Sequence, residues 1–150
     1  MNLEQKVMAE MKDAMKAKDE GTLRALRAIK AEIIKAKTEP GAGGEISGEK
    51  EISVLQKMMK QRKDSLEIYQ QQNRTDLAQK EEEEMRVIER FLPRQLTADE
   101  LRTELQQIIS ETGASSPADM GKVMGAANKK LAGRADGKTI SAVVKELLAK

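Results

Sequence analysis

The chain has 150 residues, a formal net charge of +2 and only two aromatic side chains, Tyr69 and Phe91, so aliphatic residues and methionine must build its core. It contains neither cysteine nor histidine, which excludes disulfides, classical zinc sites and histidine-based catalysis. No stretch approaches the roughly 18 apolar residues of a membrane span, and no signal peptide is recognisable, so we expect a cytoplasmic protein with no membrane contact.

Apolar residues recur at helical spacing in the first part of the chain. A first stripe steps by four from Leu3 to Met15, and a second covers residues 23–34 after a break at Gly21. Residues 39–44, Glu-Pro-Gly-Ala-Gly-Gly, cannot continue a helix and are predicted as a loop. Most of the nine methionines fall on apolar stripes, so we interpret them as core residues rather than as a promiscuous binding surface.

Two further helices are predicted before the first clear boundary. Ser47 is expected to cap a long third helix, whose residues 52–69 carry a heptad-like apolar seam. Asn73 and Thr75 supply a turn and a cap for a fourth helix. That helix should stop just before Pro93, because the residue that precedes a proline disfavours the helical conformation.

Arg62 falls on the apolar seam of the third helix, where an unpaired charge would be costly. If the third and fourth helices form an antiparallel hairpin, Glu81 or Glu84 of the acidic run 81–84 could neutralise it. The alternative interpretation is that this run is a solvated helix face under like-charge strain. In either case we assign Arg62, Glu81 and Glu84 a structural role and not a catalytic one.

Helix-start signals become regular after Pro93. Residues 97–100, Thr-Ala-Asp-Glu, form a capping box in which the Thr hydroxyl accepts a backbone N–H and the Glu reaches back. Residues 116–119, Ser-Pro-Ala-Asp, form a second box with proline at the first helical position. Asp136 caps a last helix. We therefore assign Asp119 and Asp136 to capping these helices and holding the adjacent loops.

These elements predict an all-α protein, and no strand pattern competes with them. We expect residues 1–93 to form an N-terminal domain of four helices that includes a long helical hairpin. Residues 94–150 are expected to form a small C-terminal domain of three helices. A chain of this length can bury roughly 70% of its unfolded surface, which is enough for a stable core.

No residue set suggests catalysis, a cofactor or a metal, because no serine has a histidine partner and no P-loop or G-x-G-x-x-G motif is present. Charge is unevenly distributed: residues 1–92 hold 18 cationic and 18 acidic residues, whereas residues 115–150 hold 7 and 3. The lack of stacking aromatics argues against readout of single-stranded RNA or DNA. The local basic excess instead favours binding to a phosphate backbone.

The candidate RNA-binding residues combine glycines and cations within 18 positions near two predicted helix starts: Gly121, Lys122, Lys129, Lys130, Arg134, Gly137 and Lys138. The glycines would let an RNA backbone come close, and the cations would contact phosphates. In a structural alternative, Gly121 and Gly125 permit close helix packing and the later glycines form a C-cap and a turn. Lys129, Lys130 and Arg134 would then only favour a helix C-terminus electrostatically.

Four segments of the chain carry a family resemblance. Residues 60–65 read Lys-Gln-Arg-Lys-Asp-Ser, residues 91–96 Phe-Leu-Pro-Arg-Gln-Leu, residues 119–124 Asp-Met-Gly-Lys-Val-Met and residues 133–138 Gly-Arg-Ala-Asp-Gly-Lys. Along nearly its whole length the chain resembles the GatB/YqeY family, in which the boundary more often reads Tyr-Leu-Pro, so Phe91 is a mild departure. The family comprises the C-terminal part of the GatB component of the tRNA-dependent aspartyl/glutamyl amidotransferase and small free-standing YqeY-like proteins.

The resemblance implies an all-helical fold in two parts and tRNA as a partner. In the amidotransferase this region is an appendage that approaches the outer corner of the tRNA, while the whole enzyme amidates Glu-tRNA(Gln) or Asp-tRNA(Asn) with glutamine as amide donor. The catalytic parts of that enzyme are missing here. A family-level label of carbon–nitrogen ligase with glutamine as amido-N-donor can thus apply without activity in this chain.

Our leading hypothesis is a helical module that docks a tRNA corner through its C-terminal helices, without catalytic activity of its own. The resemblance also suggests amidotransferase or aminoacyl-tRNA synthetase components as partners. The alternative is a helical protein–protein adaptor for such a complex, which would use the third and fourth helices. A membrane-surface role for the first helix is disfavoured, because Glu4, Glu10 and Asp13 sit among its cations.

Overall fold

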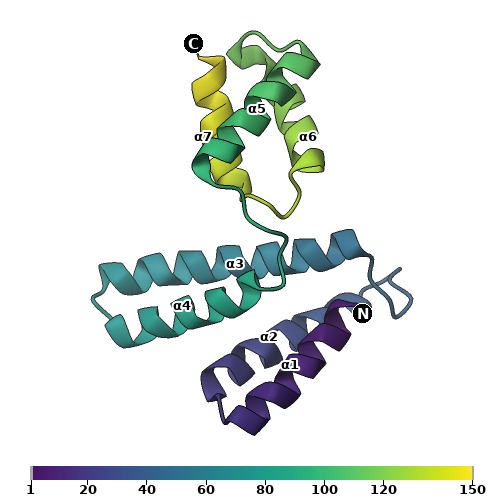
Figure 1. Cartoon of the computed structure of the whole chain (residues 1–150), viewed down its shortest axis with the longest axis vertical. Coiled ribbons are helices and arrows are strands. Elements are labelled where there is room, and N and C mark those ends of the chain that lie inside the picture. Colours follow the sequence, from purple (N-terminus) through teal and green to yellow (C-terminus); the bar gives the residue numbers. More distant parts are fainter. Residues whose placement is uncertain (1, 150) are drawn as a thin grey trace. The chain divides into compact units, whose positions relative to one another are not determined.

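The computed structural model describes residues 2–149 and confirms the predicted all-α class (Figure 1). The chain divides into two compact units, which we call the N-terminal unit (Met1–Leu92) and the C-terminal unit (Pro93–Lys150). Over residues 2–149 there is no strand, and none of the helices there is long and apolar enough to cross a membrane. Each unit has a hydrophobic core of its own.

Four helices build the N-terminal unit: α1 (Leu3–Ala17), α2 (Glu20–Lys37), α3 (Gly48–Gln71) and α4 (Thr75–Glu89). Helices α1 and α2 form one hairpin, α3 and α4 form another, and α2 packs against both helices of the second (Figure 1). The core lies where the two hairpins meet. Its largest fully buried side chains are Val7, Leu26, Ile29, Ile33, Leu55 and Ile88.

The α1–α2 junction differs slightly from the sequence prediction. Lys18 ends α1 in the left-handed conformation, with φ of 56°, and Asp19 then caps α2 by accepting hydrogen bonds from the backbone N and the Oγ1 of Thr22. The chain therefore turns before Gly21, which lies in the first turn of α2. A Cβ at Gly21 would come within 3.2 Å of Glu83 Oε2, so this glycine makes room for a carboxylate of α4.

The predicted apolar stripes are right at their centres and wrong at their ends. Met15 and Ile34, both assigned to stripes, are about half exposed, and Ala14 is buried in place of Met15. Ile34 directly follows the buried Ile33 and therefore points about 100° away from it around α2. For Met15 the cause is drift: a step of four residues advances 400° around the axis, so each step drifts by about 40° from the preceding side chain. After three such steps from Leu3, Met15 points well away from the core.

The α3–α4 hairpin has a compact turn and a sparsely buried far end. Asn73 makes the predicted turn, with φ of 56°, but Thr75 does not cap α4. The N–H of Arg74 bonds to the carbonyl of Tyr69, which closes the turn one residue earlier and makes Arg74 the N-cap. Only Leu55 and Met58 of α3 are fully buried, and both lie in its first half.

Three helices and a short 3-10 turn build the C-terminal unit: α5 (Ala98–Thr112), η1 (Pro117–Asp119), α6 (Met120–Lys130) and α7 (Gly137–Leu148). Both predicted capping boxes, at residues 97–100 and 116–119, are present. The buried side chains of the core come from all three helices and the turn after α6: Leu101, Leu105, Ile108, Val123, Ala127, Leu131, Ile140, Val144 and Leu148.

The start of the C-terminal unit is fastened to the turn that joins α6 to α7. The side-chain amide of Gln95 donates hydrogen bonds to the carbonyls of Pro93 and Gly133, at 2.8 and 2.6 Å. The next N–H, of Leu96, donates to the carbonyl of Arg134 at 2.9 Å. These bonds fix the turn that carries part of the predicted RNA-binding set.

Candidate nucleic-acid interface

The structure sorts the seven predicted RNA-binding residues into two groups at opposite ends of α6. Gly121 and Lys122 lie in its first turn. The remaining five lie at its other end, in its last turn, in the following turn and at the start of α7: Lys129, Lys130, Arg134, Gly137 and Lys138. Lys122 and Lys129 are seven residues apart, which separates them by about 10 Å along the helix axis. The sequence cluster is therefore two clusters in space.

The glycines of α6 and α7 have no structural requirement within the described residues. A Cβ added to Gly121, Gly125 or Gly137 would meet nothing within 4 Å, and none of the three has a positive φ. The alternative that Gly121 and Gly125 permit close helix packing is therefore wrong. An unneeded helical glycine costs roughly 0.5–1 kcal/mol relative to alanine. The open space lies outside the helices, where an external backbone could approach.

Gly133 differs from these three glycines. It is buried and has φ of 77°, a left-handed conformation that favours glycine. Its carbonyl accepts the hydrogen bond from Gln95, so this glycine has the structural role of shaping the turn after α6.

A carboxylate lies near each helix start: Asp119 belongs to the capping box of η1 and makes no cap hydrogen bond to α6, whereas Asp136 caps α7. Asp119 Oδ2 accepts hydrogen bonds from the backbone N of Ser115 at 2.9 Å and of Ser116 at 3.3 Å, and these bonds hold the pKa of Asp119 below its usual range. Asp136 Oδ1 accepts from the backbone N of Thr139 at 2.7 Å and caps α7. A phosphate at either helix start would meet this negative charge, so the neighbouring cations must carry the attraction.

The cations at the C-terminal end of α6 can contact an external anion. Lys129 and Lys138 are exposed and Arg134 is half-buried, and within residues 2–149 none of the three forms an ion pair. Lys130 is partly engaged, with Nζ 3.5 Å from Glu104 Oε2. At the other end, Lys122 lies close enough to Asp119 to help lower the pKa of that carboxyl. The second group therefore holds more cations without an ion-pair partner among the described residues.

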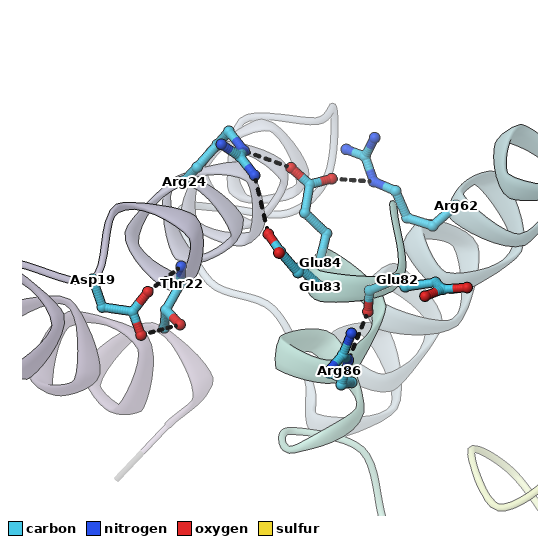
Figure 2. Close-up of polar contacts among 8 residues, drawn as sticks. All are labelled: Asp19, Thr22, Arg24, Arg62, Glu82, Glu83, Glu84 and Arg86. Atoms are coloured by element: carbon cyan, nitrogen blue, oxygen red, sulfur yellow. Dashed lines mark hydrogen bonds and ion pairs between the residues drawn. The ribbon is translucent and has the colours of Figure 1, made fainter. Parts of the chain in front are cut away.

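The predicted structural residues of the N-terminal unit, Arg62, Glu81 and Glu84, meet in one ion-pair cluster, of which Figure 2 shows Arg62 and Glu84 with Arg24 and Glu83. Glu84 is buried, and its two carboxylate oxygens face Arg62 Nε at 3.0 Å and Arg24 Nε at 3.4 Å. Arg62 Nη1 also lies 3.5 Å from Glu81 Oε2, and Arg24 Nη2 lies 3.7 Å from Glu83 Oε2. The cluster connects α2, α3 and α4, and its role is structural.

Arg24 is the member of this cluster that sequence reasoning missed. It lies on the polar side of α2, and no local pattern distinguishes it from other exposed cations of that helix. The contact depends on how α2 packs against α4, which only the tertiary structure shows. Among residues 2–149, no group of His, Cys, Asp or Glu side chains could hold a metal ion.

A family profile and a curated relative match the sequence over both units. Residues 4–148 match the profile of a family described as Yqey-like protein. A curated relative, altered inheritance of mitochondria protein 41 of Pyrenophora tritici-repentis, is 28% identical over 151 residues, which cover 95% of this chain and 79% of that protein. Both similarities extend over the N-terminal and C-terminal units, so they are not limited to the basic helices.

Proposed function

The chain belongs to the Yqey-like protein family, and from that premise we propose that it is a helical module that binds the phosphate backbone of tRNA. The observation that carries the proposal is the set of cations at the C-terminal end of α6. There Lys129, Arg134 and Lys138 have no ion-pair partner among the described residues, and Gly137 leaves open space beside them. Exposed cations beside an uncovered backbone suit a ligand that is both anionic and bulky.

Binding would follow from charge and shape. Each phosphate that a lysine or arginine neutralises releases counterions from the RNA, which makes affinity fall as salt rises. Residues 93–150 contain no aromatic side chain on which a base could stack, so we expect recognition of a structured backbone rather than of splayed bases. A folded tRNA corner presents such a backbone, and the resemblance to the amidotransferase appendage points to the same ligand.

We propose an accessory role and no catalytic activity for the chain itself. The family-level association with glutamine-dependent amide transfer would then arise from a complex with an amidotransferase or an aminoacyl-tRNA synthetase. If the accessory role holds, adding the protein to a reconstituted amidotransferase should lower the KM for tRNA while the kcat for amide transfer stays unchanged.

The decisive test is a salt titration of RNA binding. Anisotropy measurements between about 50 and 200 mM salt would compare bulk tRNA with a duplex RNA of equal charge. The variant is Lys129→Glu/Lys138→Glu, and its matched control is Lys57→Glu/Lys80→Glu, two exposed lysines of the N-terminal unit. We expect the variant alone to bind tRNA more weakly, with a salt slope smaller by about 1 for each lost contact. Equal effects of the two double reversals would overturn the site.

A further inference from the structure

The α1–α2 hairpin carries an apolar face that stays about half exposed. Met8, Met15 and Ile34 are 44%, 52% and 47% exposed. Met8 and Met15 are seven residues apart and so share one side of α1. Lys37 Nζ of α2 reaches Glu4 Oε2 of α1 at 2.7 Å, which places Ile34, one turn before Lys37, beside Met8, one turn after Glu4. We call these three side chains the α1–α2 apolar face.

This face points away from the second hairpin of the N-terminal unit. Arg90 Nη1 at the end of α4 lies 3.2 Å from Glu10 Oε1, so Glu10 marks the side of α1 that meets α4. Glu10 is two residues after Met8, or about 200° around the helix, which puts Met8 on the opposite side. The hairpin thus uses one side within the unit and leaves the other uncovered.

Cations lie beside the apolar face, and the acidic residues of α1 are either paired with cations or lie on another side of the helix. Lys12 lies one turn after Met8, and Arg27 and Lys30 lie two turns and one turn before Ile34. Within residues 2–149 none of these three cations has an ion-pair partner. Of the acidic residues that argued against a binding surface here, Glu4 is neutralised by Lys37 and Glu10 by Arg90. Asp13 lies about 140° from Met8 around α1.

We propose that the α1–α2 apolar face docks an amphipathic helix of a partner protein whose apolar stripe is flanked by Glu or Asp. Two turns of α1 separate Met8 from Met15 by about 10 Å, which matches two turns of an incoming helix laid along the hairpin. Unbranched methionines adapt to varied apolar partners. The three cations beside the face have no ion-pair partner among the described residues, so they favour a partner helix with acidic residues beside its apolar stripe. This site is separate from the proposed RNA site, which lies in the C-terminal unit.

The charges around the face disfavour the two other obvious occupants. A second copy of the chain would bring the cations of both faces together across a two-fold axis, and like charges would repel. A bilayer is disfavoured because interfacial helices insert their apolar side chains by 5–10 Å or so. The three side chains here are already half covered by the hairpin, which leaves too little of them to insert. A helix needs no such depth, because it can lie on the shallow face.

The test uses three probes with the full-length protein. The first is a synthetic 18-residue helical peptide with leucines on one face and glutamates beside them. The second is the same peptide with lysines in place of the glutamates, and the third is vesicles of phosphatidylcholine with one-third phosphatidylglycerol. Methyl NMR of the methionines reports the site directly. We expect the acidic peptide to shift Met8 and Met15 and to leave Met120 and Met124 in the C-terminal unit unchanged.

Variants separate docking from folding. Met8→Gln/Met15→Gln/Ile34→Gln should weaken binding of the acidic peptide at least tenfold without lowering Tm, because all three side chains are about half exposed and lie outside the core cluster. Ile68→Gln, at an apolar residue of α3 that is 50% exposed, is the matched control and should leave binding unchanged.

Charge reversal tests whether the cations beside the face select acidic residues on the partner helix. Arg27→Glu/Lys30→Glu should transfer the preference from the acidic to the basic peptide. The proposal is overturned if the two peptides bind the wild-type protein equally. It is likewise overturned if Met8 and Met15 do not shift with the acidic peptide, or shift only with vesicles. RNA affinity, which depends on the other unit, should be the same in the triple glutamine variant and the wild type.

Discussion

Glu84 shows how one carboxylate joins three helices. It is buried between Arg24 of α2 and Arg62 of α3, and each of its oxygens faces one guanidinium. Both arginines keep substantial solvent contact, with side chains 46% and 30% exposed, which weakens each pair. The arrangement spares Arg62 the cost of an unpaired charge at a position of the α3 seam.

The first prediction concerns this carboxylate. Glu84→Gln keeps the size of the side chain but leaves both guanidinium groups without their shared anion. We expect the free energy of unfolding, measured by urea denaturation, to fall by about 1–2 kcal/mol, below the cost for a fully buried pair. The matched control is Glu82→Gln, because the side chain of Glu82 is exposed and Arg86 contacts only its backbone carbonyl. Equal destabilisation by both changes would contradict the structural role of Glu84.

The second prediction concerns a glycine that the fold does not need. Gly121→Ala should raise the free energy of unfolding by about 0.5–1 kcal/mol, because alanine favours the helix and its Cβ meets open space. If an RNA backbone approaches here, the same change should weaken tRNA binding. Gly48→Ala, at another open helical glycine in the N-terminal unit, is the control. A stability gain with unchanged RNA affinity would remove Gly121 from the interface.

At the scale of single elements, the two capping boxes of the C-terminal unit were well predicted, whereas the cap of α4 was not. The capping boxes at residues 97–100 and 116–119 use short side chains that reach only local backbone, so four residues suffice to specify them. Apolar stripes were less reliable at their ends: steps of four drift from the helical period before Met15, and Ile34 lies about 100° around α2 from the buried Ile33.

For the candidate site, the sequence predicted the residue types but not their arrangement in space. The sequence identified exposed cations and glycines, but it could not show that Lys122 lies at the opposite end of α6 from Lys129. It did predict Asp136 as the cap of α7, because that hydrogen bond is local. The ion pair of Arg24 with Glu84 was unpredictable because it depends on residues 60 positions apart.

The third prediction concerns the start of α5. The guanidinium of Arg94, together with the backbone N–H of Thr97, lowers the pKa of Glu100 to about 2. A lowered carboxyl pKa contributes stability that is present above the unfolded pKa near 4.5 and is lost as pH falls toward 2. Glu100→Gln keeps a residue that can complete the capping box but removes the charge.

Thermal unfolding at a series of pH values tests this assignment. The Tm of Glu100→Gln should lie below that of the wild type at pH 7, and the difference should shrink as pH falls from about 4.5 toward 2. Asp99→Asn, at a neighbouring acidic residue in the first turn of α5, is the control. A Tm difference that stays constant over the whole range would show that packing, and not the charge of Glu100, sets the effect.

At the scale of the whole molecule, the two units draw on separate cores. All the core residues of the C-terminal unit lie between Leu96 and Leu148, and Gln95 and Leu96 bond to the turn at Gly133 and Arg134. The fourth prediction follows: a fragment of residues 93–150 should fold alone and keep tRNA binding with the salt dependence of the full chain. Circular dichroism and anisotropy measure both properties. A fragment that melts without cooperativity would show that its core is insufficient.

The separation of the cores has a consequence for how the protein is made. The core of the N-terminal unit uses no residue beyond Leu92, so its helices can pack as soon as that residue leaves the ribosome. Helical bundles fold in microseconds to milliseconds, whereas the ribosome adds each residue in roughly 50–200 ms. The C-terminal unit must instead wait for Gly133 and Arg134, the partners of its first residues. A nascent chain that stalls between the two points would therefore already display Met8, Met15 and Ile34 on a folded hairpin.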